Sequence, residues 1–508
     1  MSQLDRATRR RLVAAVAGTA ALAVTACSPP QPGSAASSVT IAETTAPSTL
    51  DPQGSGLFAD RFAWQLSYEC LLTTSADGTV KPALASDWKK SDDGLTYTFT
   101  LRPDVKFHNG ETLTADDVVF TFERLKKSPD GIDTELFPTW SDVTAIDKST
   151  VQFRLKAPDA GFVNNMANPL VWGCAIMSSK AAESGNPDTT MVGTGPWQQV
   201  SYRADSELKF QRFGDYWGTP AASEKLNVLY MPNIATQVSN LKAGKVDLIF
   251  PDSASAASLK GNDKIVVDKA ETDSTIFLQI NNMAKPFDNQ LVRQALALAV
   301  NREELAEKAY NGGARPSVYV PPSNAWAPKP SGLPNSTRDV AEAKRLLTEA
   351  GYPKGFATTL MYISGYDPGT DNMMALMQHQ LAEVGIRVEL VPLEAAAWSD
   401  KLTKPDYALS WNAQSYYSNP YQYIAPAPGR QGPVPASLQK LLDAALAAKD
   451  QESYQKALVA VEEEEARTVY PTITLLATDM YAAHDSALTG VEVPPSQSRT
   501  FLAQVKHD

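Results

Sequence analysis

The sequence predicts a layered α/β protein with more than one domain. The chain has 508 residues, and single hydrophobic cores stop growing near about 250–300 residues. Apolar and polar residues alternate over 96–102, which is the pattern of a half-buried strand. A helical pattern over 374–384 ends at Gly385 and is followed at once by the alternating run 386–390. A helix between short strands is the unit from which α/β domains are built.

The strand at 96–102 opens a series of elements in the first half of the chain. Residues 103–104 (Pro-Asp) provide turn chemistry after it. Residues 114–117 (Thr-Ala-Asp-Asp) predict a helix start, because a capping residue is followed by early acids. The apolar positions of 118–125 share one face of that helix.

The second half of the chain continues the mixed pattern. Asn301 and Glu304 have the spacing of a capping box, and a helical run over 340–350 ends at a glycine. A largely buried strand is predicted over 407–411. The acidic run 462–465 is interpreted as the solvated face of a helix.

Composition limits the class of protein. Hydrophobic residues make up 43% and charged residues 20% of the chain, with a net charge of -11. These values are typical of a soluble globular protein, and the acidic balance argues against a nucleic-acid partner. Four histidines without metal spacing predict neither a metal site nor a cofactor. Three cysteines are too few for a disulfide scaffold, although pairing of Cys70 with Cys174 outside the cell stays open.

Residues 1–26 are predicted to be an export signal. Arginines precede the apolar run 12–24, which is shorter than the roughly 20 residues of a membrane span. Small residues then lead to Cys27 in an order that resembles a lipobox, so lipid is expected on the Cys27 thiol. The alternative is a short membrane anchor, and the choice between Sec and twin-arginine export stays open. Residues 27–38 are rich in Pro, Gly and Ser and predict a flexible tether.

Four stretches of the mature chain carry motifs in a fixed order. They are 81–88 with 91–124, 192–197 with 215–217 and 241–249, 278–288 with 292–303, and 342–353 with 381–390. On these stretches the chain resembles the dipeptide-, oligopeptide- and nickel-binding branch of the solute-binding proteins of ABC importers, family 5. The resemblance extends through nearly the whole mature chain.

This resemblance implies an α/β, two-lobe, periplasmic-binding-protein-like fold of the large cluster, with an extra subdomain. Two crossings, near 272–281 and 475–482, would form the hinge, and the lobes would close on a ligand. The implied boundaries are 39–272 plus 478–508 for lobe 1, about 88–190 for its subdomain, and 275–475 for lobe 2.

Candidate ligand-binding residues follow from the loop-like segment 411–420 and from family positions. They are Trp411, Asn412, Gln414, Tyr416, Tyr417, Tyr68, Glu69, Asn281 and Trp326. Four of them have a structural alternative: core packing for Trp411, a solvated helix start for Glu69, turn hydrogen bonds for Asn281, and an exposed loop anchor for Trp326. Residues beyond the strand are expected in a loop, where ligand contact is favoured.

Two departures from the family pattern affect the expected ligand. Gln414 aligns with an Asp that pairs with the ammonium group of a peptide in relatives, and Ser364 aligns with an Arg that holds the carboxylate in dipeptide binders. A buried charge without a partner costs several kcal/mol (about 3–5). Capture of free dipeptides by the usual pair of charges is therefore in doubt.

The function expected from the resemblance is a non-catalytic, lipid-anchored, extracytoplasmic binding protein that passes small peptides or peptide-like compounds to an ABC permease. We expect it to act as a monomer. The alternatives are a binding protein for an oligosaccharide or another neutral solute, a chaperone-like or sensory lipoprotein, and an extracellular hydrolase. A hydrolase needs a nucleophile with a base or paired carboxylates, and no such set is recognisable in the sequence.

Overall fold

One 11-stranded sheet organises most of the chain. The computed structural model describes residues 37–54, 58–75, 78–127, 137–167, 172–320, 323–404, 406–414 and 432–508. The sheet order is β15 (Ile386–Leu393), β14 (Phe356–Ile363), β16 (Leu409–Gln414), β12 (Ile265–Ile280), β17 (Thr472–Asp485), β11 (Leu248–Ile249), β1 (Ser38–Glu43), β10 (Lys225–Tyr230), β9 (Glu207–Arg212) and β8 (Trp197–Arg203), with β13 (Ala314–Pro316) beside β17.

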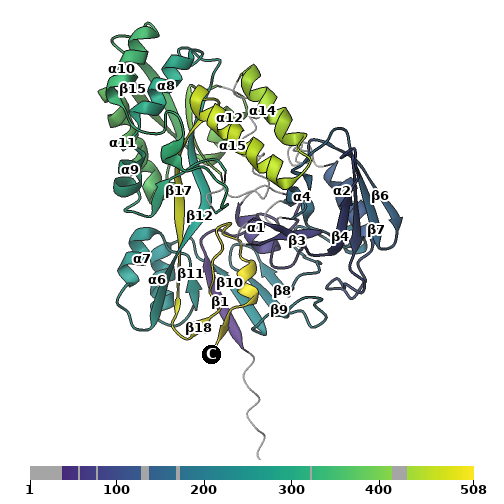
Figure 1. Cartoon of the computed structure of the whole chain (residues 1–508). Coiled ribbons are helices and arrows are strands. Elements are labelled where there is room, and N and C mark those ends of the chain that lie inside the picture. Colours follow the sequence, from purple (N-terminus) through teal and green to yellow (C-terminus); the bar gives the residue numbers. More distant parts are fainter. Residues whose placement is uncertain are drawn as a thin grey trace, which may run out of the picture. The chain divides into compact units, whose positions relative to one another are not determined.

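Two long antiparallel strands, β12 and β17, cross the middle of this sheet. At one end β17 pairs with β11, and at the other β12 pairs with β16. Their mutual register shifts between Glu271 and Thr275, where a bulge bends and twists a strand. Arg315 lies across this point and donates to Asp479 Oδ1 at 2.8 Å and to Thr272 O at 2.8 Å. Figure 1 shows the helix-covered region of β15 at one end of the two strands and the region of β11 at the other.

Buried apolar side chains form two main clusters on either side of the bulge. The first draws on residues between Val39 and Leu248 and between Ala482 and Val505. The second draws on residues between Ile276 and Leu476. We call these regions lobe 1 and lobe 2. Both α/β patterning and the strands expected at 96–102 and 386–390 are confirmed.

Lobe 1 carries a second, four-stranded sheet. Its order is β4 (Ala85–Lys90), β5 (Thr96–Leu101), β7 (Thr150–Leu155) and β6 (Trp140–Asp147). Helix α2 (Ala115–Leu125) begins as predicted, with Thr114 Oγ1 donating to Asp117 at 2.9 Å. Phe122 of this helix packs edge-on against Phe153 and Trp140 of the sheet. This edge-to-face packing joins helix and sheet into one core.

Lobe 2 contains the longer helices. Its helices are α8 (Gln290–Ala299), α9 (Arg302–Glu304), the π-turn η2 (Leu305–Ala309), η3 (Pro330–Gly332), α10 (Val340–Glu349), α11 (Pro368–Glu383), α12 (Ala395–Thr403), α14 (Ala436–Leu446) and α15 (Gln451–Thr468). The helix predicted at 340–350 is confirmed. Helices α14 and α15 share an apolar cluster with Phe277 and Tyr319.

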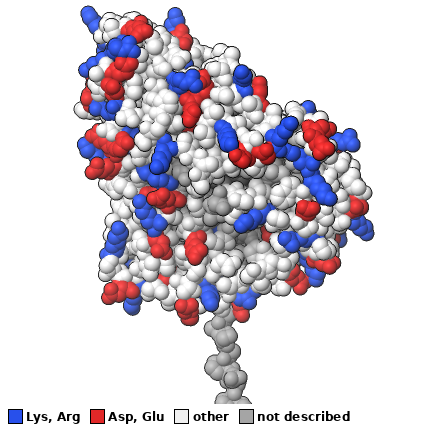
Figure 2. Space-filling model, in the orientation of Figure 1, with Lys and Arg blue, Asp and Glu red and all other residues white. Residues whose placement is uncertain are grey.

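Shorter elements complete lobe 1. They are α1 (Phe58–Trp64), β2 (Leu72–Thr74), β3 (Val80–Pro82), α4 (Phe162–Asn165), η1 (Trp172–Cys174), α5 (Ser179–Ser184), α6 (Ile234–Lys242), α7 (Ser253–Leu259), β18 (Leu488–Thr489), η4 (Thr500–Ala503) and β19 (Lys506–His507). Acidic and basic side chains intermix over the face seen in Figure 2. Among the described residues, no helix combines the length and apolar character needed to span a membrane.

Two local predictions are wrong. The strand predicted at 407–411 is β16, which continues to Gln414 because Gln414 pairs with Thr275 of β12. Gln414 therefore ends a strand and does not lie in a loop. The acidic run is also not a solvated face: Glu462, Glu464 and Glu465 are each only 2–3% exposed. Helix α15 is covered there by α14 and by the segment containing Tyr319.

Candidate functional site

A cavity of about 620 Å³ opens in lobe 1 beside the bulge of β12. Such a volume falls in the range typical of small-molecule sites. Its wall combines lobe 1, the crossing strand and one residue of the segment that follows β13. The charged and aromatic lining residues are Tyr68, Glu69, Arg102, Trp197, Tyr216, Trp217 and Asp273, with Ser323 and the C-terminal residues 494–496 beside them.

Glu69 accepts more side-chain hydrogen bonds than the other acid of this wall. Its Oε2 accepts hydrogen bonds from Thr194 Oγ1 at 2.8 Å and Trp217 Nε1 at 2.8 Å, and its Oε1 accepts one from Tyr216 Oη at 2.9 Å. Burial raises the pKa of the Glu69 carboxyl, and these three donors together with Arg102 oppose that rise. The carboxyl is thus fixed in orientation by the side chains that surround it.

Arg102 places a cation on the same wall. Its Nε donates to Ala83 O at 2.5 Å, and its guanidinium lies 4.7 Å from the centre of the Trp217 ring. Among the described residues, its two terminal nitrogens donate no hydrogen bond and its side chain forms no ion pair. A guanidinium held in this way can offer two parallel N–H groups to a carboxylate.

Asp273 supplies a second acid where β12 bends. It is 1% exposed and accepts hydrogen bonds from Ser323 N at 2.9 Å and Ser323 Oγ at 2.5 Å. Burial raises the pKa of its carboxyl, and the two Ser323 donors lower it. The cavity therefore has one cation and two acids, so groups of either sign on a ligand could find a partner.

A disulfide closes the wall next to Glu69. Cys70 and Cys174 are bonded, with 5.1 Å between their Cα atoms and 104 residues between them in sequence. The pairing that the sequence left open is therefore present. It ties the segment that carries Glu69 to the short turn η1.

Tyr68 and Glu69 are the two sequence-predicted residues that line the cavity. Tyr68 is 2% exposed, and its hydroxyl accepts a hydrogen bond from Val192 N at 3.2 Å. Glu69 is not a solvated helix start, since it follows α1 in a hydrogen-bonded segment. Whether either residue contacts a ligand stays a prediction.

The residues predicted from β16 lie in lobe 2 and do not line this cavity. Trp411 is 1% exposed and packs against Tyr366 and Trp398 with ring centres 4.8 and 6.5 Å apart, so the core alternative describes its position. Asn412 donates to Gln279 Oε1 at 3.2 Å. Gln414, half-buried, lies opposite Thr275 and so close to the bulge. Its role in ligand binding stays a prediction.

Asn281 and Trp326 are engaged in local structure. Asn281 was expected at the hinge, but it lies past the far end of β12, where its Nδ2 donates to Tyr407 O at 2.9 Å and its Oδ1 accepts from Met283 N at 3.1 Å. Trp326 is half-buried and packs against the cluster of α14 and α15. Tyr416, Tyr417 and Cys27 lie outside the described residues.

Arg102, Tyr216, Trp217 and Asp273 were missed as site residues. Three of them, Arg102, Tyr216 and Trp217, stand inside stretches that suggested the family, and no ligand role was assigned to them there. A signal for Arg102 existed, because it ends the alternating strand at 96–102. No local pattern pointed to Asp273, since its position depends on the bulge. Among the described residues no cluster of His, Cys, Asp or Glu could hold a metal ion.

Comparison with known proteins identifies a family. A profile of the bacterial extracellular solute-binding proteins, family 5 (middle), matches residues 79–432. The glutathione-binding protein GsiB of Salmonella typhi is 29% identical over 505 residues, covering 92% of this chain and 94% of that protein. The dipeptide-binding protein of Escherichia coli is 31% identical over 354 residues, covering 64% and 65%.

A solved structure extends the similarity to the whole fold. The dipeptide-binding protein of Pseudoalteromonas sp. SM9913 in complex with Met-Leu is 25% identical and superposes with a TM-score of 0.78, covering 93% of this chain and 100% of that one. The expectation of a two-lobe α/β fold is confirmed by this similarity.

Proposed function

Because the chain belongs to the bacterial extracellular solute-binding proteins of family 5, we propose that it captures a small peptide or peptide-like compound and delivers it to the permease of an ABC importer. Members of this family are transport binding proteins of the extracytoplasmic side and not enzymes. The glutathione and dipeptide ligands of its relatives support the choice of ligand.

One observation carries this proposal: the lobe 1 cavity has a cation and two acids on the same wall. The terminal N–H groups of Arg102, which donate to no described residue, can bind a carboxylate, and Asp273 and Glu69 are acids near which an ammonium group would be stabilised. Peptides carry both groups at neutral pH. The carboxylate and the guanidinium that relatives have at the positions of Gln414 and Ser364 would thus be replaced by charged groups from lobe 1 and the crossing strand.

Capture by closure is the proposed mechanism. β12 and β17 are continuous between the lobes, so bending at the bulge would move one lobe against the other. The lobes also touch away from the cavity: Ala160 N donates to Leu446 O at 3.1 Å and Lys90 Nζ to Lys449 O at 2.9 Å. A ligand that contacts both lobes only when they are together would favour that closed state.

We further propose a lipid anchor at Cys27 and the lobe boundaries 39–272 plus 478–508 and 275–475. The order of basic, apolar and small residues before Cys27 supports the anchor. The two separate apolar clusters support the boundaries. Mass spectrometry of the protein purified from membranes tests the anchor, because an unmodified Cys27 in an intact chain would exclude it.

Native mass spectrometry of the purified mature protein tests the ligand. We expect one small zwitterionic molecule per chain, and calorimetric titration of short peptides should reproduce saturable binding without turnover. The aromatic pair Tyr216 and Trp217, with ring centres 5.8 Å apart, favours an oligosaccharide as the second candidate. Binding of neutral sugars with no binding across a peptide library would replace the peptide assignment.

A further inference from the structure

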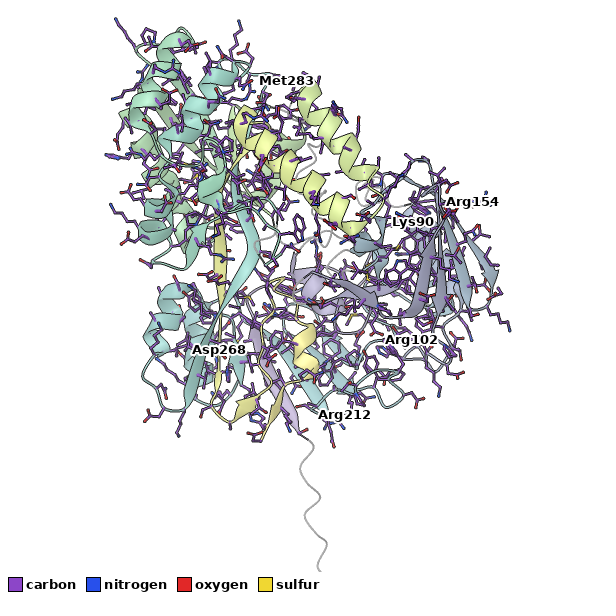
Figure 3. The ribbon with its side chains drawn as sticks, in the orientation of Figure 1. Lys90, Arg102, Arg154, Arg212, Asp268 and Met283 are labelled. Carbon is purple, nitrogen blue, oxygen red and sulfur yellow. A yellow bond between two sulfur atoms is a disulfide. The ribbon has the colours of Figure 1, made fainter. Side chains whose placement is uncertain are left out.

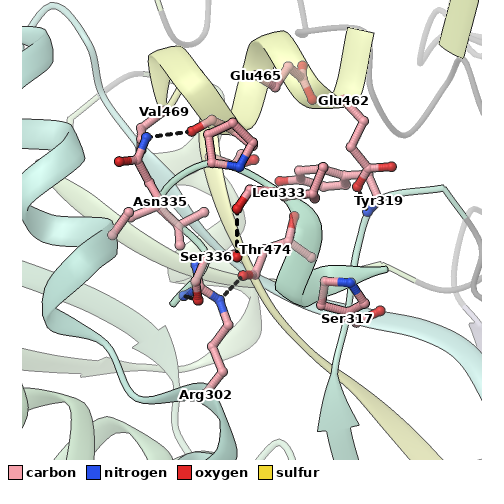
Figure 4. Close-up of a pocket in the computed structure, with 16 residues that line it drawn as sticks. Arg302, Ser317, Tyr319, Leu333, Asn335, Ser336, Glu462, Glu465, Val469 and Thr474 are labelled. Atoms are coloured by element: carbon pink, nitrogen blue, oxygen red, sulfur yellow. Dashed lines mark hydrogen bonds between the residues drawn. The ribbon is translucent and has the colours of Figure 1, made fainter. Parts of the chain in front are cut away.

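Lobe 2 contains a second, much smaller space that the ligand cavity does not include. It has a volume of about 40 Å³ and lies between α15, β17, α9 and the segments before and after η3 (Figure 4). We call it the lobe 2 chamber. Its polar lining residues are Arg302, Ser317, Tyr319, Asn335, Ser336, Glu462, Glu465, Thr472 and Thr474.

Glu465 is an acid without a partner in this chamber. It is 3% exposed, and neither of its carboxyl oxygens has a hydrogen-bond partner among the described residues. The Oγ1 of Thr472, which lines the same space, is also buried without a partner. A buried carboxylate with neither donor nor cation is strongly unfavourable. An ionised Glu465 would therefore need a donor or a cation from beyond the described residues.

The groups around Glu465 do not compensate a negative charge on its carboxyl. Glu462 already accepts hydrogen bonds from Tyr319 N at 2.5 Å and Val320 N at 3.1 Å. Arg302 is the cation of the chamber, and it donates to Ser336 O at 2.6 Å and Thr474 O at 2.8 Å. Among the described residues neither Glu462 nor Glu465 forms an ion pair, so an ionised Glu465 would have no compensating cation.

The remaining titratable groups facing Glu465 are neutral phenols. Tyr319 and Tyr470 both lie within its electrostatic reach, and burial raises the pKa of each hydroxyl. Burial raises the pKa of Glu462 to about 7, and burial together with Glu462 raises the pKa of Glu465 well above its ordinary value. Two acids that share one buried site titrate apart, because the first charge opposes the second.

The chamber has room for water. One buried water needs about 10–15 Å³ measured in the same way, so the volume of about 40 Å³ holds two or three. We propose that the lobe 2 chamber is a water-filled acid site, in which Glu465 keeps its proton and donates a hydrogen bond to a water molecule that also bonds Thr472 Oγ1.

The chamber contacts the segment 317–323, which extends from the chamber to the ligand cavity. Glu462 holds the backbone of Tyr319 and Val320. Ser323, three residues further along, contacts Asp273 in the cavity wall. Ionisation of the chamber would therefore be expected first at the 317–320 segment, as a local loss of order.

Glu465→Gln is the test, with Glu463→Gln as its matched control, because Glu463 is the exposed member of the same acidic run. An acid whose folded pKa is raised is fully stabilising only below its unfolded pKa, and that stability is lost as the pH rises. Chemical denaturation between pH 5 and 8 measures the folding equilibrium constants of Glu465→Gln and the wild type. The ratio of the variant's constant to that of the wild type should rise with pH by up to about tenfold per pH unit. Glu463→Gln should follow the wild type.

Two other results would overturn the proposal. Parallel stability curves for the wild type and Glu465→Gln would mean that Glu465 is ionised throughout. Stabilisation of the wild type alone by sodium or potassium, compared with choline at equal ionic strength, would assign the chamber to a cation. If Glu465→Gln does not fold, infrared spectroscopy of the wild type at pH 8 decides, since a carboxylic-acid carbonyl band must remain above the pKa of about 7 of Glu462.

Discussion

Two buried glutamates, one in each lobe, meet opposite local environments. Glu69 in lobe 1 receives three side-chain hydrogen bonds, from Thr194, Tyr216 and Trp217. Glu465 in lobe 2 receives none from the described residues and lines a small chamber. Burial raises the pKa of both carboxyl groups. The comparison indicates that hydrogen-bond donors, and not burial alone, decide how far the pKa of a buried acid is raised.

The difference also matches the role proposed for each lobe. The lobe 1 cavity presents oriented polar groups, because Trp217 contacts the Arg102 guanidinium with its ring and donates its Nε1–H to Glu69 Oε2. The lobe 2 chamber is small and partly open to solvent, and its volume of about 40 Å³ is enough for a few water molecules. An oriented charge is useful for recognising a solute, whereas a neutral acid senses the proton concentration.

Among the changes that distinguish the two lobes, removal of the disulfide should have the largest effect on the free energy of unfolding. Replacing Cys70 and Cys174 by serine opens a link across 104 residues, which is expected to lower the free energy of unfolding by about 4 kcal/mol. Only lobe 1 should be affected. Denaturation with and without reductant measures the effect, and the serine variant should be insensitive to reductant. A loss confined to lobe 2 would contradict the placement of the link.

Glu69→Gln should act in the opposite direction to Glu465→Gln. The new amide nitrogen cannot accept a hydrogen bond, so at least one of Thr194, Tyr216 and Trp217 loses its acceptor. We expect a loss of about 2 kcal/mol in the free energy of unfolding. Denaturation of both variants at pH 8 measures the contrast. Equal stabilisation by both substitutions would break the distinction between the two acids.

Arg102→Gln should weaken binding of carboxylate-bearing ligands without unfolding the protein. A hydrogen bond to a charged group contributes about 1.5–3 kcal/mol, so the affinity should fall roughly ten- to hundredfold. Arg154→Gln is the control, because Arg154 is exposed on β7 of the same lobe (Figure 3). Calorimetry with peptides whose carboxyl end is free or amidated separates the role of Arg102 from general binding. Equal losses for both peptide forms would remove the carboxylate from the contact.

Gln414→Ala should have the smallest effect on stability. Gln414 is half-buried at the end of β16, and its side chain forms no hydrogen bond with a described residue. A change below about 0.5 kcal/mol in the free energy of unfolding is expected. A measurable loss of peptide affinity in this variant would extend the ligand site from lobe 1 into lobe 2. Unchanged affinity would leave recognition to the lobe 1 cavity.

Periodicity was sufficient for much of the fold. The alternation at 96–102 and the helix-to-strand change at Gly385 both predicted elements that the structure contains. Local patterns succeed where the chain forms its own hydrogen bonds or buries one regular face. The end of β16 was misplaced because its last residues are held by β12, which is distant in sequence.

The sequence by itself determined the α/β class and the family. It also indicated two residues of the lobe 1 cavity wall, Tyr68 and Glu69. Only the tertiary structure decided that Arg102 and Asp273 share a cavity and that Glu462 and Glu465 are buried. The physical reason is that local periodicity records which residues prefer water or the core, whereas electrostatic partners depend on distances between segments. A run of glutamates is solvated in most helices, and here α14 and the Tyr319 segment cover it.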